Sequence, residues 1–230
     1  MIALRDSLRR AVIVLPLLLL AGPRLTAQDG KQKPLDIEAK LIKGAEDGNV
    51  QMQLELGIAY LTGKHDIKTD PRKAFAWLQK AAEPTKNEAG QPVRNPRALL
   101  YVGLCYDEYY KQLEMKQNQN EALKYYLLAV ENGLPQANHY VAFTYRELGQ
   151  DDKAADYFRA AADFGNQICQ LEYARILLQG RGVKADPVAA RKYLRLAARN
   201  GSQEAQHLLD ELDGRESQPA PVPATPETVR

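Results

Sequence analysis

The chain has few of the side chains from which active sites are most often built. It contains three histidines, two cysteines and three serines among its 230 residues. No histidine stands at metal-ligand spacing from another histidine or a cysteine, and no serine lies in a nucleophile-elbow pattern. Paired acids, as at 107–108 and 151–152, are adjacent in sequence and are typical of solvated faces or helix caps. We therefore expect no catalytic residue, no cofactor and no metal site.

The chain also lacks an excess of charge of either sign. Its 31 basic and 29 acidic residues leave a formal net charge of +2. Residues 1–27 hold four arginines and one aspartate, so the remaining chain carries a net charge of −1. A nucleic-acid-binding domain presents a basic patch or stripe, and this composition does not favour one. We expect no nucleic-acid partner.

Long apolar runs are scarce, and the clearest one lies near the N-terminus. The run Ala11–Ala21 follows three arginines, a combination typical of a secretory signal peptide. It predicts a signal peptide over 1–27, a flexible stretch over 28–35 and an exported protein, either periplasmic or secreted. The alternative is an uncleaved membrane anchor. A spanning helix needs about 20 apolar residues, and Pro16 interrupts this shorter run, so we expect no stable anchor after cleavage.

Internal repetition, in contrast, is abundant. Four columns of residues recur four times at helical spacing: a small residue, an aromatic residue three positions later, a large apolar residue and another small one. The columns are Ala74, Ala122, Ala154 and Ala190; Trp77, Tyr125, Tyr157 and Tyr193; Leu78, Tyr126, Phe158 and Leu194; and Ala81, Ala129, Ala161 and Ala197.

A second set of columns precedes each of these segments. Its middle position holds Gly57, Gly103, Ala142 and Ala174, flanked by apolar residues at helical spacing. Each unit is thus a pair of amphipathic helices, in which a small residue on the first helix lets the second approach closely. One pair cannot bury both of its faces, so neighbouring pairs stack. The sequence predicts an all-α fold, a right-handed α/α solenoid of about four helix pairs.

The columns also give the domain boundaries. The predicted solenoid covers 36–212, with terminal capping helices that shield the ends of the array. The tail 213–230 holds four prolines and little that is large and apolar, so we expect disorder; a proline-rich ligand for a partner is the alternative. The predicted repeats lie at approximately 50–83, 96–133, 135–165 and 167–201, and the capping helices at 36–47 and 202–212.

These repeats resemble the Sel1-like family, which is related to the tetratricopeptide repeats. The family pattern is roughly Ala-x-x-x-Leu-Gly-x-x-Tyr, then Gly-x-Gly-Val-x-x-Asp, then Lys-Ala-x-x-Trp-Tyr-x-Lys-Ala-Ala. The resemblance implies a solenoid whose first helices line a concave, protein-binding side. The middle two units lack the Gly-x-Gly-Val turn. The first unit matches at Leu56, Gly57, Tyr60, Gly63, Asp70, Lys73, Ala74, Trp77, Lys80, Ala81 and Ala82, and the fourth at Gly180, Gly182, Val183, Asp186, Ala190, Tyr193, Ala197 and Ala198.

Local signals predict several helix ends. Asp70 and Asp186 each precede a proline and are expected to be N-caps. Asn118 or Asn120 is expected to cap a helix in the second unit, and Asp151 one in the third. Glycines close three of the four units in the manner of left-handed helix ends. These glycines are Gly133, Gly165 and Gly201, and the polar stretches 84–96 and 111–120 are predicted to be loops.

The two cysteines occupy small apolar positions of first helices. Cys105 lies in the slot of Ala59, and Cys169 in that of Ala98. Packed helices lie about 8–10 Å apart, so two repeats of separation exceed the roughly 7 Å limit between bridged Cα atoms. We expect both thiols to be buried and free. Some secreted members of the family carry a cysteine pair in each repeat, with an attributed antibiotic-hydrolysing activity, but this chain lacks those pairs.

The remaining functional signal is a surface on the first helices. An apolar floor carrying arginines suits a peptide with an acidic group or a free carboxylate. The alternative is that the apolar members pack between repeats. The candidate peptide-binding residues are Arg97, Leu100, Leu104, His139, Phe143, Arg146 and Arg175.

These features predict an exported, non-enzymatic interaction or scaffold module. It would bind a protein or peptide of unknown identity on the concave face of the solenoid. The alternative is a secreted enzyme, or a regulator of an enzyme at the cell envelope. An enzyme needs clustered polar groups that the repeat columns do not explain, which distinguishes the two hypotheses.

Overall fold

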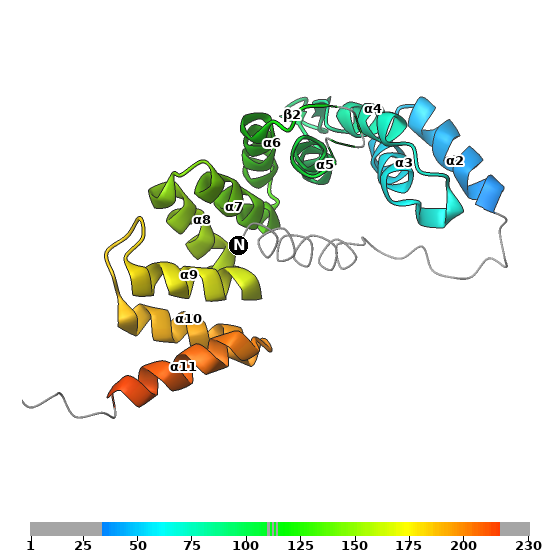
Figure 1. The fold of residues 1–230 in the computed structure, drawn as a ribbon. Coiled ribbons are helices and arrows are strands. Elements are labelled where there is room, and N and C mark those ends of the chain that lie inside the picture. Colours follow the sequence, from blue (N-terminus) through cyan, green and yellow to red (C-terminus); the bar gives the residue numbers. More distant parts are fainter. Residues whose placement is uncertain (1–33, 110, 112, 114, 217–230) are drawn as a thin grey trace, which may run out of the picture. The chain divides into compact units, whose positions relative to one another are not determined.

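A computed structural model describes residues 34–109, 111, 113 and 115–216 as an all-α repeat solenoid (Figure 1). The first helices of the repeats are α3 (Val50–Thr62), α5 (Pro96–Asp107), α7 (Asn138–Glu147) and α9 (Gln167–Gln179). The second helices are α4 (Pro71–Ala81), α6 (Gln119–Glu131), α8 (Asp151–Asp163) and α10 (Pro187–Arg199). Helices α2 (Pro34–Glu46) and α11 (Gln203–Glu216) flank them, and short 3-10 turns lie at η1 (Lys64–Asp66) and η2 (Pro135–Ala137).

The helices form two compact units. Unit 1 extends to Thr144 and unit 2 begins at Tyr145, so the boundary falls inside α7. In unit 1, α2 packs on α3, α3 on α4, α4 on α5 and α5 on α6. In unit 2, α8 packs on α9, α9 on α10 and α10 on α11. Within each unit, these consecutive helices thus pack on one another, as expected of stacked helix pairs.

Three of the four repeat columns form the core, whereas the aromatic column is mostly half-buried. The large apolar column, Leu78, Tyr126, Phe158 and Leu194, has no solvent-exposed surface in any of the four repeats. The two alanine columns, four residues before and three residues after the large apolar residue in each repeat, are also buried. Small residues on both sides let the helices approach and leave the large side chain in the space between them. The all-α solenoid predicted from the columns is therefore confirmed.

Most helix ends follow the local signals. Asp70 accepts a hydrogen bond from the Lys73 backbone N–H at 3.0 Å, and Asp186 accepts one from that of Ala189 at 2.9 Å. Of the two alternatives in the second unit, Asn118 is the cap. Asp151, however, is not an N-cap, because α8 begins one residue earlier than that role requires. Its side chain binds Arg181 instead. The three predicted glycine ends have φ between 90° and 96°.

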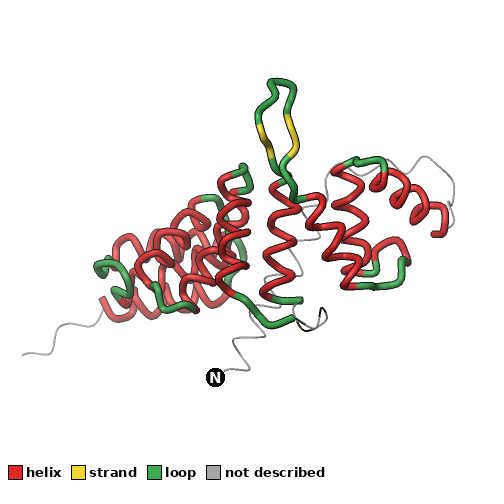
Figure 2. Tube along the Cα trace, turned by 90° about the horizontal axis from the view of Figure 1, so that it is seen from above, coloured by secondary structure: helices red, strands yellow, loops and turns green. Residues whose placement is uncertain are grey.

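The first polar stretch of the second repeat is more ordered than the predicted loop. It contains a short antiparallel hairpin, β1 (Thr85–Lys86) with β2 (Pro92–Val93), which extends away from the neighbouring helices (Figure 2). The Asn87 side chain accepts a hydrogen bond from the Gln91 backbone N–H at 2.8 Å and closes the turn. Arg94 donates to the Ala82 carbonyl at 2.9 Å and holds the base of the hairpin.

Both thiols are buried and free. Cys105 belongs to unit 1 and Cys169 to unit 2. Burial raises the pKa of the Cys105 thiol to about 12, and it also raises the pKa of Cys169. Because the thiolate is the reactive form, both side chains behave as small core residues.

The terminal helices differ in extent from the sequence expectation. Helix α2 begins at Pro34, inside the stretch expected to be flexible. Helix α11 continues through Asp213 and Gly214 to Glu216, past the predicted start of the tail. Asp213 forms an ion pair with Arg191 of α10 at 3.2 Å, which fastens this last part of the helix. The predicted signal peptide, residues 28–33 and the tail from 217 lie outside the described residues.

Candidate functional site

In unit 1, the candidate residues of α5 divide between core and surface. Leu100 and Leu104 are 1% and 0% exposed, so they pack in the core rather than lining an accessible groove. Arg97 is half-buried in the first turn of the helix. Its guanidinium lies near the Tyr101 side chain. Burial raises the pKa of Tyr101 to about 12, and the nearby positive charge of Arg97 opposes that rise.

The first helix of the third repeat, α7, contributes one buried and one half-buried candidate to unit 1. His139 is 4% exposed, and its Nδ1 lies 2.6 Å from the Gln136 carbonyl oxygen. Since a carbonyl only accepts, Nδ1 carries the proton, and the unprotonated Nε2 has no hydrogen-bond partner among the described residues. Burial lowers the pKa of His139 to about 4, so the ring is neutral at pH 7. His139 is therefore a core residue, whereas Phe143 is half-buried.

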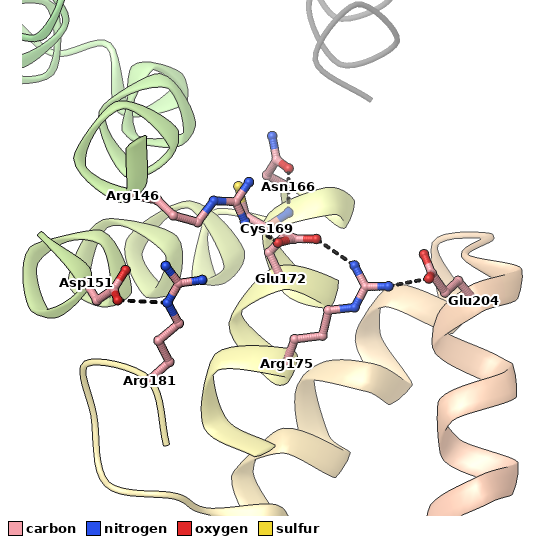
Figure 3. Close-up of polar contacts among 8 residues, drawn as sticks. All are labelled: Arg146, Asp151, Asn166, Cys169, Glu172, Arg175, Arg181 and Glu204. Atoms are coloured by element: carbon pink, nitrogen blue, oxygen red, sulfur yellow. Dashed lines mark hydrogen bonds and ion pairs between the residues drawn. The ribbon is translucent and has the colours of Figure 1, made fainter. Parts of the chain in front are cut away.

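In unit 2, the two candidate arginines belong to a network of ion pairs in which arginines and glutamates alternate (Figure 3). Glu172 on α9 forms ion pairs with Arg146 of α7 and with Arg175, the latter at 2.7 Å. Arg175 also pairs with Glu204 of α11. The Arg146 guanidinium lies over the Phe158 ring, 5.2 Å from its centroid. The expected arginines on an apolar floor are thus not isolated charges. In unit 2 they alternate with glutamates, and each arginine is paired with at least one of them.

A fourth ion pair lies in the same region. The Arg181 Nε donates to Asp151 at 2.8 Å and joins the α9–α10 loop to the start of α8. Five of these charged side chains line a pocket of about 190 Å³. Its lining residues are Arg146, Asp151, Ala154, Glu172, Arg175, Ile176, Gln179 and Arg181.

Sequence reasoning found two of these pocket residues and missed three charged ones. Arg181 stands between Gly180 and Gly182, at the variable position of the Gly-x-Gly-Val turn, so the family pattern gives no signal for it. Asp151 was expected to cap a helix. Glu172 precedes Arg175 by three residues, a spacing that favours an ion pair on one helix face, and that signal could have identified it.

The pocket has the chemistry of an anion-binding site. Among the lining residues, three guanidinium groups face two carboxylates, and Glu204 balances the remaining positive charge from outside the pocket. Guanidinium N–H groups bind planar oxyanions with well-defined geometry. Among the described residues, no group of histidine, cysteine, aspartate and glutamate side chains could hold a metal ion. The described residues also include no helix that is long and apolar enough to cross a membrane.

Comparisons with known proteins show the fold and the family. No curated protein matches the chain. A protective antigen of uropathogenic Escherichia coli strains, which displays an SLR fold, is 30% identical with a TM-score of 0.63. The alignment covers 76% of this chain but only 36% of that antigen. A Sel1 repeat protein from Oxalobacter formigenes is 23% identical with a TM-score of 0.61, covering 79% of this chain and 70% of that one, and this likeness shows the fold alone.

The family model of the Sel1 repeat matches the chain four times and covers more than half of its length. Sel1 repeats generally form protein–protein interaction modules. The matched residues are 50–83, 96–134, 137–166 and 167–202. The chain therefore belongs to the Sel1 repeat family.

Proposed function

We propose that this protein is an exported, non-enzymatic scaffold that binds another protein or a peptide through the first helices of its repeats. The observation that carries the proposal is the pocket of unit 2, where charged side chains from α7, α8, α9 and the α9–α10 loop converge. The core columns do not require these charges. The geometry suits recognition of a polar group, and the repeat family supplies the expectation of a protein partner.

Partner contacts are assigned to the candidate residues that keep some exposed surface. These are Arg97 and Phe143 in unit 1, and Arg146 and Arg175 in unit 2. Leu100, Leu104 and His139 support the same helices from within the core. The near-neutral net charge of the chain favours a protein partner over nucleic acid, because nucleic-acid-binding domains are usually basic.

Export is proposed from the N-terminal apolar run. We expect the exported protein to begin at Gln28, because a run of this length is cleaved as a signal rather than retained as a span. N-terminal sequencing and the intact mass of the protein recovered outside the cytoplasm test this. A membrane-bound protein that retains Met1 would contradict both the cleavage and the absence of an anchor.

Affinity capture from a cell-envelope extract tests partner binding. We expect the Arg175→Ala protein to bind the captured partner at least about tenfold more weakly, equivalent to about 1.4 kcal/mol, because the first helix loses a guanidinium. The matched control is Arg159→Ala on the second helix α8, which also removes an arginine paired with an acid three residues away. That control should bind as the wild type does. Equal loss in both variants, or no partner for the wild type, would refute the proposal.

The alternative, an envelope enzyme or a regulator of one, is separated by the same experiment. A scaffold leaves its partner chemically unchanged and its activity unaltered when they are mixed. Conversion of the partner, or a change in its catalytic rate, would favour the alternative.

A further inference from the structure

The unit 2 pocket offers more hydrogen-bond donors than its own acids can satisfy. A guanidinium group carries five N–H donors. Arg181 binds Asp151 through Nε alone, and no hydrogen bond joins its two terminal nitrogens to another described residue. Arg175 uses Nη1 for Glu172 and Nη2 for Glu204. The pocket therefore has donor capacity left for an incoming acceptor, with Arg175 and Arg181 both in its lining.

The two glutamates that contact Arg175 are held very differently. Glu172 is 17% exposed and is shared by two arginines on the pocket wall. Glu204 is 57% exposed, reaches Arg175 from α11 and does not line the pocket. An exposed ion pair contributes only about 0–1 kcal/mol. Glu172 is thus part of the pocket, while the Glu204 carboxylate can leave for solvent at little cost.

We propose that this pocket binds one carboxylate of a partner peptide, and that Glu204 occupies Arg175 until the peptide displaces it. The inference rests on the proposed scaffold function and names its ligand chemistry. The carboxylate comes from an acidic side chain or from a chain end. Its single charge matches the single positive charge in excess among the lining residues.

The apolar part of the pocket fits the same ligand. Ala154 and Ile176 line it beside the charged groups, and the Gln179 amide is available to a peptide backbone. A volume of about 190 Å³ takes one side chain or chain end rather than a folded surface. The peptide carboxylate would replace Glu204 at Arg175 and use the terminal nitrogens of Arg181, so the charge of the pocket is neutralised without moving Glu172.

The test begins with selection of a random peptide library on the full chain. The best peptide is then synthesised in three forms: unchanged, with its acidic side chains converted to amides, and with an amidated C-terminus. We expect the unchanged peptide to bind at least about tenfold more tightly than one of the two altered forms, which identifies the source of the carboxylate. Arg181→Gln should remove this preference, while Arg159→Gln on α8 should leave it intact.

Glu204→Gln tests the displacement step and should tighten binding about threefold, because Arg175 loses the exposed partner that the peptide must displace and keeps only Glu172. The matched control is Glu211→Gln on the same helix, whose side chain pairs with His207 instead and should have no effect. Equal binding of all three peptide forms, or weaker binding by Glu204→Gln, would overturn the inference while Arg175-dependent capture of a protein still upheld the scaffold function. Failure to select any peptide and to capture any protein would overturn both.

Discussion

Replacing Gly182 by alanine is expected to lower the free energy of unfolding by about 2–5 kcal/mol. Gly182 has φ of 72°, where an L-residue costs about 1–2 kcal/mol. An added Cβ would also lie 2.3 Å from the Asp151 carbonyl oxygen and 2.7 Å from the Asp152 nitrogen. These are backbone atoms, so the overlap cannot be relieved by rotating a side chain, and overpacking typically adds about 1–3 kcal/mol. Thermal and urea unfolding measure the change.

Gly165→Ala is the matched control for the backbone term. Gly165 has φ of 95°, but no atom lies within 4 Å of its added Cβ. It should therefore lose only about 1–2 kcal/mol. The Gly182 variant should also displace Arg181 from Asp151, because Arg181 directly precedes Gly182 in the α9–α10 loop. Equal destabilisation by the two variants would show that the close approach between this loop and α8 is wrong.

Gly103→Ala is expected to cost about 1–3 kcal/mol through overpacking in unit 1. Its Cβ would lie 2.5 Å from Cε1 of Tyr126 and 3.3 Å from the Ala122 carbonyl oxygen. The Tyr126 ring is fully buried, and its hydroxyl donates to Asp107 at 3.2 Å. The ring must therefore shift against its neighbours and disturb that hydrogen bond. Differential scanning calorimetry is a suitable measurement.

The same substitution at Gly214 should not lower the free energy of unfolding. Gly214 lies in α11 with no atom within 4 Å of its added Cβ. Alanine is favoured over glycine in a helix by about 1 kcal/mol, so Gly214→Ala should be neutral or stabilising. A Gly103 variant as stable as the Gly214 variant would contradict the packing of α5 on α6.

The solenoid was predictable because the same positions are buried in every repeat, so the same residue types recur there along the sequence. A position such as Phe158 has the same neighbours in every repeat, so its column carries the same chemistry four times. Helix caps such as Asp70 were predictable because the signal is local. The hairpin at Asn87 was not predicted, because its turn is formed by hydrogen bonds within an insertion that the repeat columns do not describe.

The site was less predictable because it depends on residues outside the columns. Arg146 and Arg175 were predicted as candidate peptide-binding residues, but Glu204 belongs to a terminal helix that the columns describe only in part. Its contact with Arg175 spans 29 residues of sequence, and no local pattern encodes it. Leu100 and His139 were predicted to line a groove but are buried in the core. Helical spacing alone does not distinguish a groove position from a core position.

Amide hydrogen exchange on the protein, with and without its captured partner, tests the central claim most directly. The first helices α5, α7 and α9 should gain protection on binding, with the largest change around Arg175. The exposed turns of the second helices α4, α6, α8 and α10 should exchange at the same rate in both states. Protection confined to those second helices, with α9 unchanged, would contradict binding through the first helices of the repeats.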